Sequence, residues 1–201
     1  MEESVFCQNG ISRKEGSSKI ILFRGRLTPE SGIFHILKSA ELLKERKDII
    51  FRIVGFHYQL GQQVKDIIKE KKLANVELVY DYLSDNALFE KMKDASISLG
   101  QFESSPRLDR TIPHKVFESM IMKIPLITAH SPAVGELLKD GEDCIFVRRA
   151  DPAHLAEKIS FLADNPEIRK KLADNARFVY DKKCSTEVLT AKLFDIINKQ
   201  R

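Results

Sequence analysis

The sequence contains no tryptophan, only three cysteines and no apolar run of the about 20 residues that a membrane-spanning helix needs. Its N-terminus, Met1-Glu2-Glu3, is acidic where a secretion signal is basic. Cys7, Cys144 and Cys184 are odd in number and widely spaced, which excludes a disulfide framework and a Cys-x-x-Cys zinc pair. We therefore expect a cytoplasmic protein with reduced thiols that is neither secreted nor inserted into a membrane.

A strong charge of one sign is also missing. The chain has 33 Lys and Arg and 29 Asp and Glu, a net charge of +4, and both signs are mixed along its length. Nucleic-acid binding usually needs a basic stripe with aromatic side chains that stack on bases. Here the basic residues occur as pairs such as Lys170-Lys171, and most of the twelve Phe lie in apolar segments. We expect a solvated surface and no nucleic-acid partner.

What the sequence does contain is a regular alternation of short apolar runs and amphipathic helical patterns, beginning at residue 19. The runs predicted to be strands are 20–23, 49–54, 76–79, 95–99, 125–128 and 144–147. Strands joined by helices pair in parallel, because the crossover carries the chain back along the sheet. The pattern predicts a single Rossmann-like, doubly wound α/β domain with a parallel sheet of about six strands, helices on both faces and a helical C-terminal tail.

Composition changes along the chain predict its organisation. Residues 1–18 lack hydrophobic periodicity and are interpreted as an entry segment or linker. Residues 19–165 form the predicted core, and residues 166–201 add C-terminal helices to the same domain. Asp151-Pro152 and Asn165-Pro166 each combine an N-cap residue with a first-turn proline, and they separate the closing helices.

The loop after the first predicted strand is the first candidate site. Doubly wound sheets bind ligands beyond the carboxyl ends of their strands, where helix N-termini favour anions. Gly25 permits a sharp turn there, and Thr28 with Pro29 is expected to start a helix. Arg26 places a guanidinium beside that N-terminus, which indicates a phosphate site. A surface ion pair between Arg26 and Glu30 is the structural alternative that the spacing leaves open.

The second candidate site begins at Pro113, which is predicted to start a helix. Val116 and Phe117 face the core in this helix, while Lys115 and Glu118 share a different face. A carboxylate one turn into the helix can accept hydrogen bonds from two adjacent ribose hydroxyls, with the lysine near phosphate. An exposed Lys115–Glu118 ion pair is the structural alternative.

The histidines do not have the spacing of metal ligands, so no metal site is expected. His57 follows the glycine that ends the second predicted strand, and His114 opens the helix of the second site. Both are candidates for contact with a sugar or a phosphate, and a hydrogen-bonded structural role is the alternative for each.

Five segments, in this order along the chain, resemble the nucleotide-sugar half of GT-B glycosyltransferases, and in particular the family 4 retaining glycosyltransferases. These segments are Gly25-Arg26-Leu27-x-Pro29-Glu30-x-Gly32, Phe51-Arg52-Ile53-Val54-Gly55, Asn75-Val76-Glu77-Leu78 leading to Leu83-Ser84-Asp85-x-x-Leu88, Pro113-His114-Lys115-x-x-Glu118-Ser119-Met120-x-x-Lys123-x-Pro125-Leu126-Ile127 and Glu136-Leu137-Leu138-x-x-Gly141. The tail, with Asn165-Pro166-Glu167-x-Arg169, is also similar to the closing helices of that domain. The resemblance implies the C-terminal, donor-binding half of a GT-B fold.

The resemblance also implies roles by position. Arg26 would bind the donor pyrophosphate, Glu118 would hold the ribose, and Lys115 would neutralise leaving-group charge. The remaining expected substrate contacts are Gly25, Ser31, His57, Leu83, Arg110 and His114, with Leu83 near the base. In that family a sugar passes from a UDP- or GDP-sugar to an acceptor hydroxyl, with retention at the anomeric carbon and without a cofactor or an essential metal.

Two positions depart from the family pattern. The family often has a lysine where this chain has Ser31, a loss for which Lys115 would compensate. The first glutamate of the family's pair falls at Arg110, and Glu103 or Asp109 would have to supply a carboxylate instead. The departure keeps a second function open, that of a non-catalytic nucleotide-sugar-binding subunit.

The resemblance covers the donor lobe alone, so an N-terminal acceptor-binding domain is expected in cis or in trans. The amphipathic stretch 186–199 could pack on that lobe, and the lobe itself would make any peripheral membrane contact. The implied activity is that of a hexosyltransferase in polysaccharide synthesis. Another doubly wound module, such as a response regulator, lacks support because no acidic triplet and no Gly-x-Gly-x-x-Gly follows the first strand.

Overall fold

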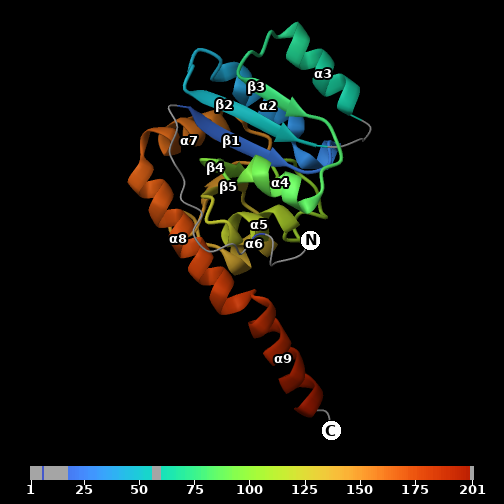
Figure 1. The fold of residues 1–201 in the computed structure, drawn as a ribbon, viewed down its shortest axis with the longest axis vertical. Coiled ribbons are helices and arrows are strands. Elements are labelled where there is room, and N and C mark those ends of the chain that lie inside the picture. Colours follow the sequence, from blue (N-terminus) through green and yellow to red (C-terminus); the bar gives the residue numbers. More distant parts are fainter. Residues whose placement is uncertain (1–5, 7–17, 56–59, 200–201) are drawn as a thin grey trace.

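The computed structural model of the chain describes residue 6, residues 18–55 and residues 60–199. At its centre lies a six-stranded sheet with the strand order β3-β2-β1-β4-β5-β6 and parallel pairing throughout (Figure 1). The strands are β1 (Lys19–Arg24), β2 (Ile49–Val54), β3 (Val76–Val79), β4 (Ile97–Leu99), β5 (Leu126–Ala129) and β6 (Ile145–Val147). The doubly wound α/β prediction is confirmed.

Three strands begin later than their apolar runs predicted. Pro125 does not belong to β5, since it has no N–H to donate to the ladder, although its carbonyl accepts a hydrogen bond of 2.9 Å from the Ser98 N–H. Cys144 forms an isolated bridge with Asp140 and precedes β6. Ala95 turns out of the helix before β4, where its N–H donates to the Met92 carbonyl.

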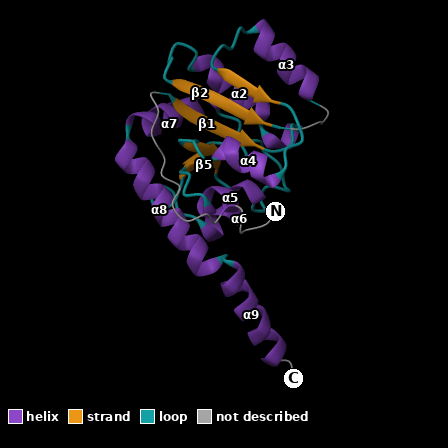
Figure 2. Cartoon of the chain, viewed as in Figure 1, coloured by secondary structure: helices purple, strands orange, loops and turns teal. Residues whose placement is uncertain are grey.

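Helices cover both faces of the sheet (Figure 2). One layer contains α2 (Ile33–Leu42), α3 (Gly61–Glu70) and α7 (Pro152–Asp164), and the other contains α4 (Asp85–Met92), α5 (His114–Ile121), α6 (Pro132–Leu137) and α8 (Pro166–Lys183). Leu22 and Phe23 are neighbours on β1, yet they belong to different hydrophobic clusters. This follows from the strand period of two, which sends successive side chains to opposite faces.

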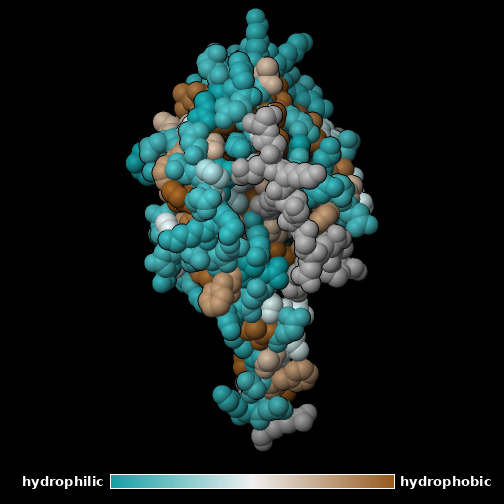
Figure 3. Space-filling model, turned by 60° about the vertical axis from the view of Figure 1, so that its left-hand side comes forward, coloured by the Kyte–Doolittle hydropathy of each residue, from teal (hydrophilic) through white to brown (hydrophobic). Residues whose placement is uncertain are grey.

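The last helix, α9 (Thr186–Lys199), extends from the end of α8 away from the sheet (Figure 1). None of its residues is buried. Its exposed apolar side chains are Leu189, Leu193, Phe194, Ile196 and Ile197. Figure 3 shows hydrophobic surface in brown at the narrow end of the molecule. The helix is thus amphipathic with an uncovered apolar stripe. No helix in the described ranges is long and apolar enough to cross a bilayer.

The two predicted N-caps of the closing helices have different outcomes. The Asp151 carboxylate accepts a hydrogen bond of 2.9 Å from the His154 N–H and caps α7 as predicted. Asn165 does precede Pro166 at the predicted N-cap position of α8, but its side chain makes no capping hydrogen bond, because its amide donates backwards to the Phe161 carbonyl at 2.7 Å. Asn165 therefore stabilises the end of α7 and not the start of α8.

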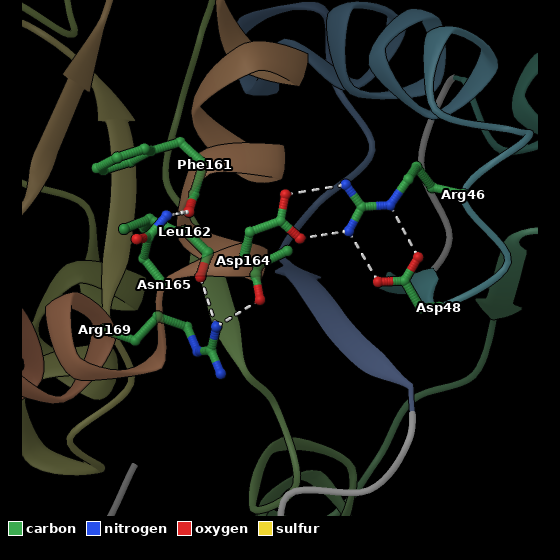
Figure 4. Close-up of polar contacts among 8 residues, drawn as sticks. Arg46, Asp48, Phe161, Leu162, Asp164, Asn165 and Arg169 are labelled. Carbon is green, nitrogen blue, oxygen red and sulfur yellow. Dashed lines mark hydrogen bonds and ion pairs between the residues drawn. The ribbon is translucent and has the colours of Figure 1, made fainter.

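Arg169 completes this turn from within α8 (Figure 4). It is 4% exposed, and its Nη1 donates to the carbonyls of Leu162 at 2.5 Å and Ala163 at 2.8 Å. The last carbonyls of a helix have no partner within the helix, so a buried guanidinium can satisfy them. On the other side of the turn, Asp164 pairs with Arg46 at 2.7 Å. The Asn-Pro-…-Arg motif is therefore a connector between helices.

Replacing Arg169 with Ala is expected to destabilise the chain by about 3 kcal/mol, because two buried carbonyls lose charge-assisted hydrogen bonds. For a chain of this size the melting temperature should fall by roughly 6–12 °C. Thermal unfolding followed by circular dichroism measures the change. Lys170→Ala is the matched control, because Lys170 is its exposed neighbour and should change stability by under about 0.5 kcal/mol. Equal melting temperatures for the two variants would contradict the connector role.

Candidate functional site

The candidate site lies where the order of the strands reverses. β1 continues through β2 to β3 on one side, and β4 continues through β5 to β6 on the other. Because all the strands are parallel, β1 and β4 end at the same edge, and in doubly wound sheets the ligand crevice lies between the loops that follow such a pair of strands. α5 begins at this edge, and no described side chain caps its N-terminus at Pro113.

Lys115 lies in the first turn of α5, at this edge of the sheet, with only 7% of its surface exposed. Its Nζ is 3.4 Å from the carbonyl oxygen of Gly100 and 3.9 Å from the centre of the Phe23 ring. Burial lowers the pKa of this lysine to about 7, while attraction by Glu118 raises it and repulsion by Arg24 lowers it further. The group can therefore change charge near neutral pH.

Glu118 lies one turn further along α5 and is 2% exposed. Neither of its carboxylate oxygens accepts a hydrogen bond from any residue that the structure describes. Its ion-pair partner is Arg24, whose Nη1 is 3.1 Å from Oε1. Burial raises the pKa of Glu118 above its ordinary value, although Arg24 and Lys115 both act to lower it. The predicted alternative of an exposed Lys115–Glu118 pair is wrong, because both side chains are buried.

Gly25 brings the end of β1 close to the lysine. A Cβ at this position would lie 3.0 Å from Nζ of Lys115, and the glycine has φ of +153°, which side-chain-bearing residues rarely adopt. Its N–H donates to the Val54 carbonyl at 3.0 Å. The predicted sharp turn is present, and the absence of a side chain there leaves room for the Lys115 ammonium.

The turn after Gly25 differs from the predicted helix start. The residues Pro29–Ser31 form one short 3-10 turn, and α2 begins only after Gly32, which has φ of +72°. Thr28 stands before this turn without a capping hydrogen bond from its side chain. The Ser31 hydroxyl donates to the Thr28 carbonyl at 2.6 Å. Ser31 therefore closes the turn, and its position as a substrate contact stays a prediction.

Arg26 is exposed on this turn. The groups that lower the pKa of Glu30 are its own backbone N–H, the Thr28 side chain and the charge of Arg107. The predicted Arg26–Glu30 ion pair is not among them. Arg26 stays a predicted phosphate ligand at the rim, one residue beyond Gly25.

The loop from 103 to 113 carries the charged residues that the sequence left as alternatives. Asp109 pairs with Arg149, and Glu103 lies 3.2 Å from Nε2 of His35. Arg110 is exposed, and its guanidinium makes no hydrogen bond or ion pair with the described residues. The two carboxylates are thus held by other partners, while the Arg110 guanidinium stays exposed.

A shallow pocket open to solvent lies at the carboxyl ends of β4 and β5. Among its lining residues are Gln101, Thr128, Ser131 and Arg149. The side-chain oxygen of Gln101 is buried and accepts no hydrogen bond from the described part of the chain. The pocket therefore offers polar groups that a hydroxylated ligand could satisfy.

The other predicted contacts are scattered along the rim. His114 is exposed at the first position of α5, and Leu83 is half-buried before α4, packed against the core. His57 lies outside the described residues. Among the residues that are described, no group of three or more His, Cys, Asp or Glu side chains is placed to hold a metal ion.

Sequence reasoning missed Arg24. Arg24 is the last residue of β1, whose four central residues are apolar, and it comes immediately before Gly25. A charged residue at the carboxyl end of a buried strand is a usable signal, because burial of an arginine requires a partner. The partner itself, Glu118, is too distant in the sequence for local patterns to identify it.

The comparisons with known proteins agree with this fold. Residues 8–179 match the model of the family described as "Glycosyl transferases group 1". The alpha-D-kanosaminyltransferase of Streptomyces kanamyceticus is 27% identical over 158 residues, which are 78% of this chain and 39% of that protein. The chain spans between 38% and 50% of the length of the curated relatives it matches.

Solved structures are similar over nearly the whole chain. The C-terminal domain of LpcC, a glycosyl transferase group 1 family protein from Francisella tularensis, has a TM-score of 0.75 at 16% identity, covering 92% of this chain and 99% of that one. Anabaena HepE in complex with UDP and glucose has a TM-score of 0.77 at 13% identity, covering 98% of this chain and 53% of that one. At these identities the likeness shows the fold alone.

Proposed function

Because the chain belongs to the family of group 1 glycosyl transferases, we propose that it binds a UDP- or GDP-sugar in the crevice between β1 and β4. The observation that carries this proposal is the state of Glu118. A carboxylate that is 2% exposed and accepts no hydrogen bond from the described residues is costly unless a ligand supplies donors. Two adjacent ribose hydroxyls supply one donor to each oxygen.

Cations at the same edge suit the diphosphate. Lys115 lies one helical turn from Glu118, and Arg26 lies just beyond Gly25 on the opposite wall. When the sugar leaves the diphosphate, negative charge grows on the phosphate oxygen, and fixed cations stabilise it without reorganisation. We assign this neutralisation to the two side chains, with no cofactor and no essential metal.

The proposed reaction is retaining transfer of a hexose. The bond between the anomeric carbon and the phosphate oxygen breaks, and its electron pair stays on the diphosphate. The acceptor hydroxyl oxygen bonds to the anomeric carbon on the same face, and its proton passes to the leaving diphosphate. The pocket with the unsatisfied Gln101 oxygen is the space we assign to the sugar, where sugar hydroxyls would donate.

The known proteins support this choice of donor. The HepE structure holds UDP and glucose, and the mannosyltransferase of Mycolicibacterium hassiacum and the kanosaminyltransferase carry sugar transfer in their names. We extend the proposal to glycan or polysaccharide synthesis in the cytoplasm, with UDP and GDP both retained as nucleotide candidates.

The proposal also includes an acceptor-binding domain. The chain spans at most about half the length of its curated relatives, and α9 presents an uncovered apolar stripe that includes Leu189 and Leu193. We propose that the acceptor domain, in cis or in trans, covers this stripe and makes any peripheral membrane contact. Transfer by this chain without that domain is expected to be poor.

A second candidate function rests on Arg110. Where the family has a carboxylate, this chain has an exposed guanidinium, and the nearby Glu103 and Asp109 are held by other partners. A nucleotide-sugar-binding subunit without catalysis fits that arrangement. Binding of the donor with no transfer after an acceptor domain is supplied would favour this second function.

Glu118→Gln is expected to weaken binding of UDP or GDP about tenfold or more, because the charged acceptor of both ribose hydroxyls is lost. Isothermal titration calorimetry of each nucleotide with the 201-residue chain measures the effect. Glu136→Gln is the matched control, since Glu136 is exposed on α6 and should bind like the wild type. The proposed site would be rejected if the wild type bound neither UDP nor GDP, or if Glu118→Gln and Glu136→Gln bound the nucleotide with equal affinity.

A further inference from the structure

Arg24 is the one charged contact of the crevice that comes from β1. Its side chain is 29% exposed at the end of that strand, and its Nη1 reaches 3.1 Å from Oε1 of Glu118 on α5. Position 24 therefore joins the two walls of the crevice, one a strand and the other a helix.

The contact is an ion pair without a hydrogen bond. Both oxygens of Glu118 are without a hydrogen-bond donor from the described residues, although the guanidinium is close to one of them. Arg24 thus supplies positive charge while the oxygens keep their lone pairs for another partner. A carboxylate accepts up to about four hydrogen bonds, so the ion pair does not compete with two incoming hydroxyls.

The other charged groups around Glu118 do not replace Arg24. Lys115, from α5 itself, directs its ammonium to the Gly100 carbonyl. His114, also on α5, acts on the carboxylate only through space, and Asp85 on α4 repels it. Among the described residues, Arg24 is therefore the cation that pairs directly with Glu118.

We propose that Arg24 is a positioning residue that holds Glu118 as an oriented carboxylate with both oxygens presented to a ribose diol. The inference rests on the proposed function, because Arg24 can act in this way only if Glu118 binds the ribose of a nucleotide. A buried carboxyl that loses its cation takes up a proton more readily, and a protonated carboxyl has a weaker acceptor and an added donor. Loss of Arg24 should therefore affect recognition of ribose hydroxyls and not phosphate binding in general.

The test compares UDP with 2′-deoxy-UDP by calorimetry at pH 6 and pH 8, or the guanine pair if the wild type prefers GDP. The wild type should bind UDP about tenfold more tightly than 2′-deoxy-UDP at both pH values, the discrimination expected from one charged hydrogen bond. In Arg24→Gln the ratio should fall to about one at pH 6 and recover in part at pH 8. Arg24→Lys, which keeps the charge, should restore most of the ratio.

Arg52→Gln is the control. Arg52 is a half-buried arginine on the neighbouring strand β2, and its Nε lies 2.9 Å from Oε2 of Glu77. Replacing it removes an ion pair of the fold that does not involve Glu118, so this variant shows the effect of a structural change alone. It should leave the UDP to 2′-deoxy-UDP ratio unchanged at both pH values. Circular dichroism checks that each variant is folded.

The outcomes separate two failures. If the wild type binds neither UDP nor GDP, the proposed function is rejected, and Arg24 loses its role with it. If the wild type prefers UDP to 2′-deoxy-UDP and Arg24→Gln shows the same ratio at pH 6, only the positioning role is overturned. The same conclusion follows if Arg24→Gln binds UDP more tightly than the wild type does. Should Arg24→Gln not fold, Arg24→Met replaces it, and NMR titration of the Glu118 carboxyl decides: a pKa of Glu118 above that of the wild type supports the role, and identical titrations overturn it.

Discussion

Lys115→Met is expected to weaken nucleoside diphosphate binding about 100-fold and to raise the melting temperature of the free chain by about 5 °C. The loss of affinity follows because the diphosphate would lose a cation held inside the crevice. The gain in stability follows because Lys115 is 7% exposed, and within the described ranges the close partners of its ammonium are the Gly100 carbonyl, at 3.4 Å, and the Phe23 ring. Met fills the same space without a charge to desolvate, so the cost of burying the ammonium is removed.

The same variant should change how stability depends on pH. The folded chain lowers the pKa of Lys115 from 10.5 to about 7. Between these two values the unfolded chain binds more protons at this group, so its contribution to stability rises as the pH increases from 7 to 10. That contribution is lost as the pH falls through 7. In Lys115→Met this rise should disappear, which urea unfolding at several pH values measures.

Lys171→Met is the matched control, because Lys171 is exposed on α8 and makes no ion pair with the described residues. It should leave nucleotide affinity, melting temperature and pH dependence unchanged. A Lys115→Met chain that binds UDP or GDP with wild-type affinity would remove the lysine from the site. A lower melting temperature would show that the ammonium contributes more to the fold than its burial costs.

The fold was predictable because period-two and helical patterns are local. Leu22 and Phe23 alone show the alternation that places one side chain in each hydrophobic cluster. Strand ends were less predictable, since backbone hydrogen bonds decide them: Pro125 is as apolar as its neighbours but has no N–H for the ladder. The side-chain partner of the N-cap residue Asn165 was not predictable for a similar reason, because Asn165 could bond to either of the helices it separates, and its amide donates to the Phe161 carbonyl.

The candidate site was predictable only in part. The spacing of Lys115 and Glu118 placed them on one helix face, but hydropathy alone assigns such residues to the surface. Their burial depends on the loops after β1 and β4, including Gly25, which no helical pattern contains. The Arg24–Glu118 pair joins residues far apart in the sequence, so it depends on the parallel sheet being complete.

Nucleotide binding should take up nearly one proton at pH 8 and become up to tenfold weaker for each pH unit above 7. In the free chain the pKa of Lys115 is about 7, so at pH 8 the amine is mostly neutral. A bound diphosphate favours the ammonium and raises that pKa, and binding therefore draws a proton from the buffer. The phosphate groups of UDP, with a highest pKa of about 6, are already ionised there and do not supply this effect.

Calorimetry in two buffers of different ionisation enthalpy counts the protons. The binding heats measured in the two buffers differ by the number of protons taken up multiplied by the difference between the two ionisation enthalpies. The wild type should show uptake at pH 8 and much less at pH 6, where Lys115 is already charged. Lys115→Met should show no uptake from this group at either pH. In Glu118→Gln the pKa of Lys115 should fall further, since the attraction of the carboxylate is lost, and uptake should already begin below pH 7. Equal heats in both buffers for the wild type at pH 8 would mean that Lys115 stays neutral beside the diphosphate, and the electrostatic part of the proposed site would then have to rest on Arg26.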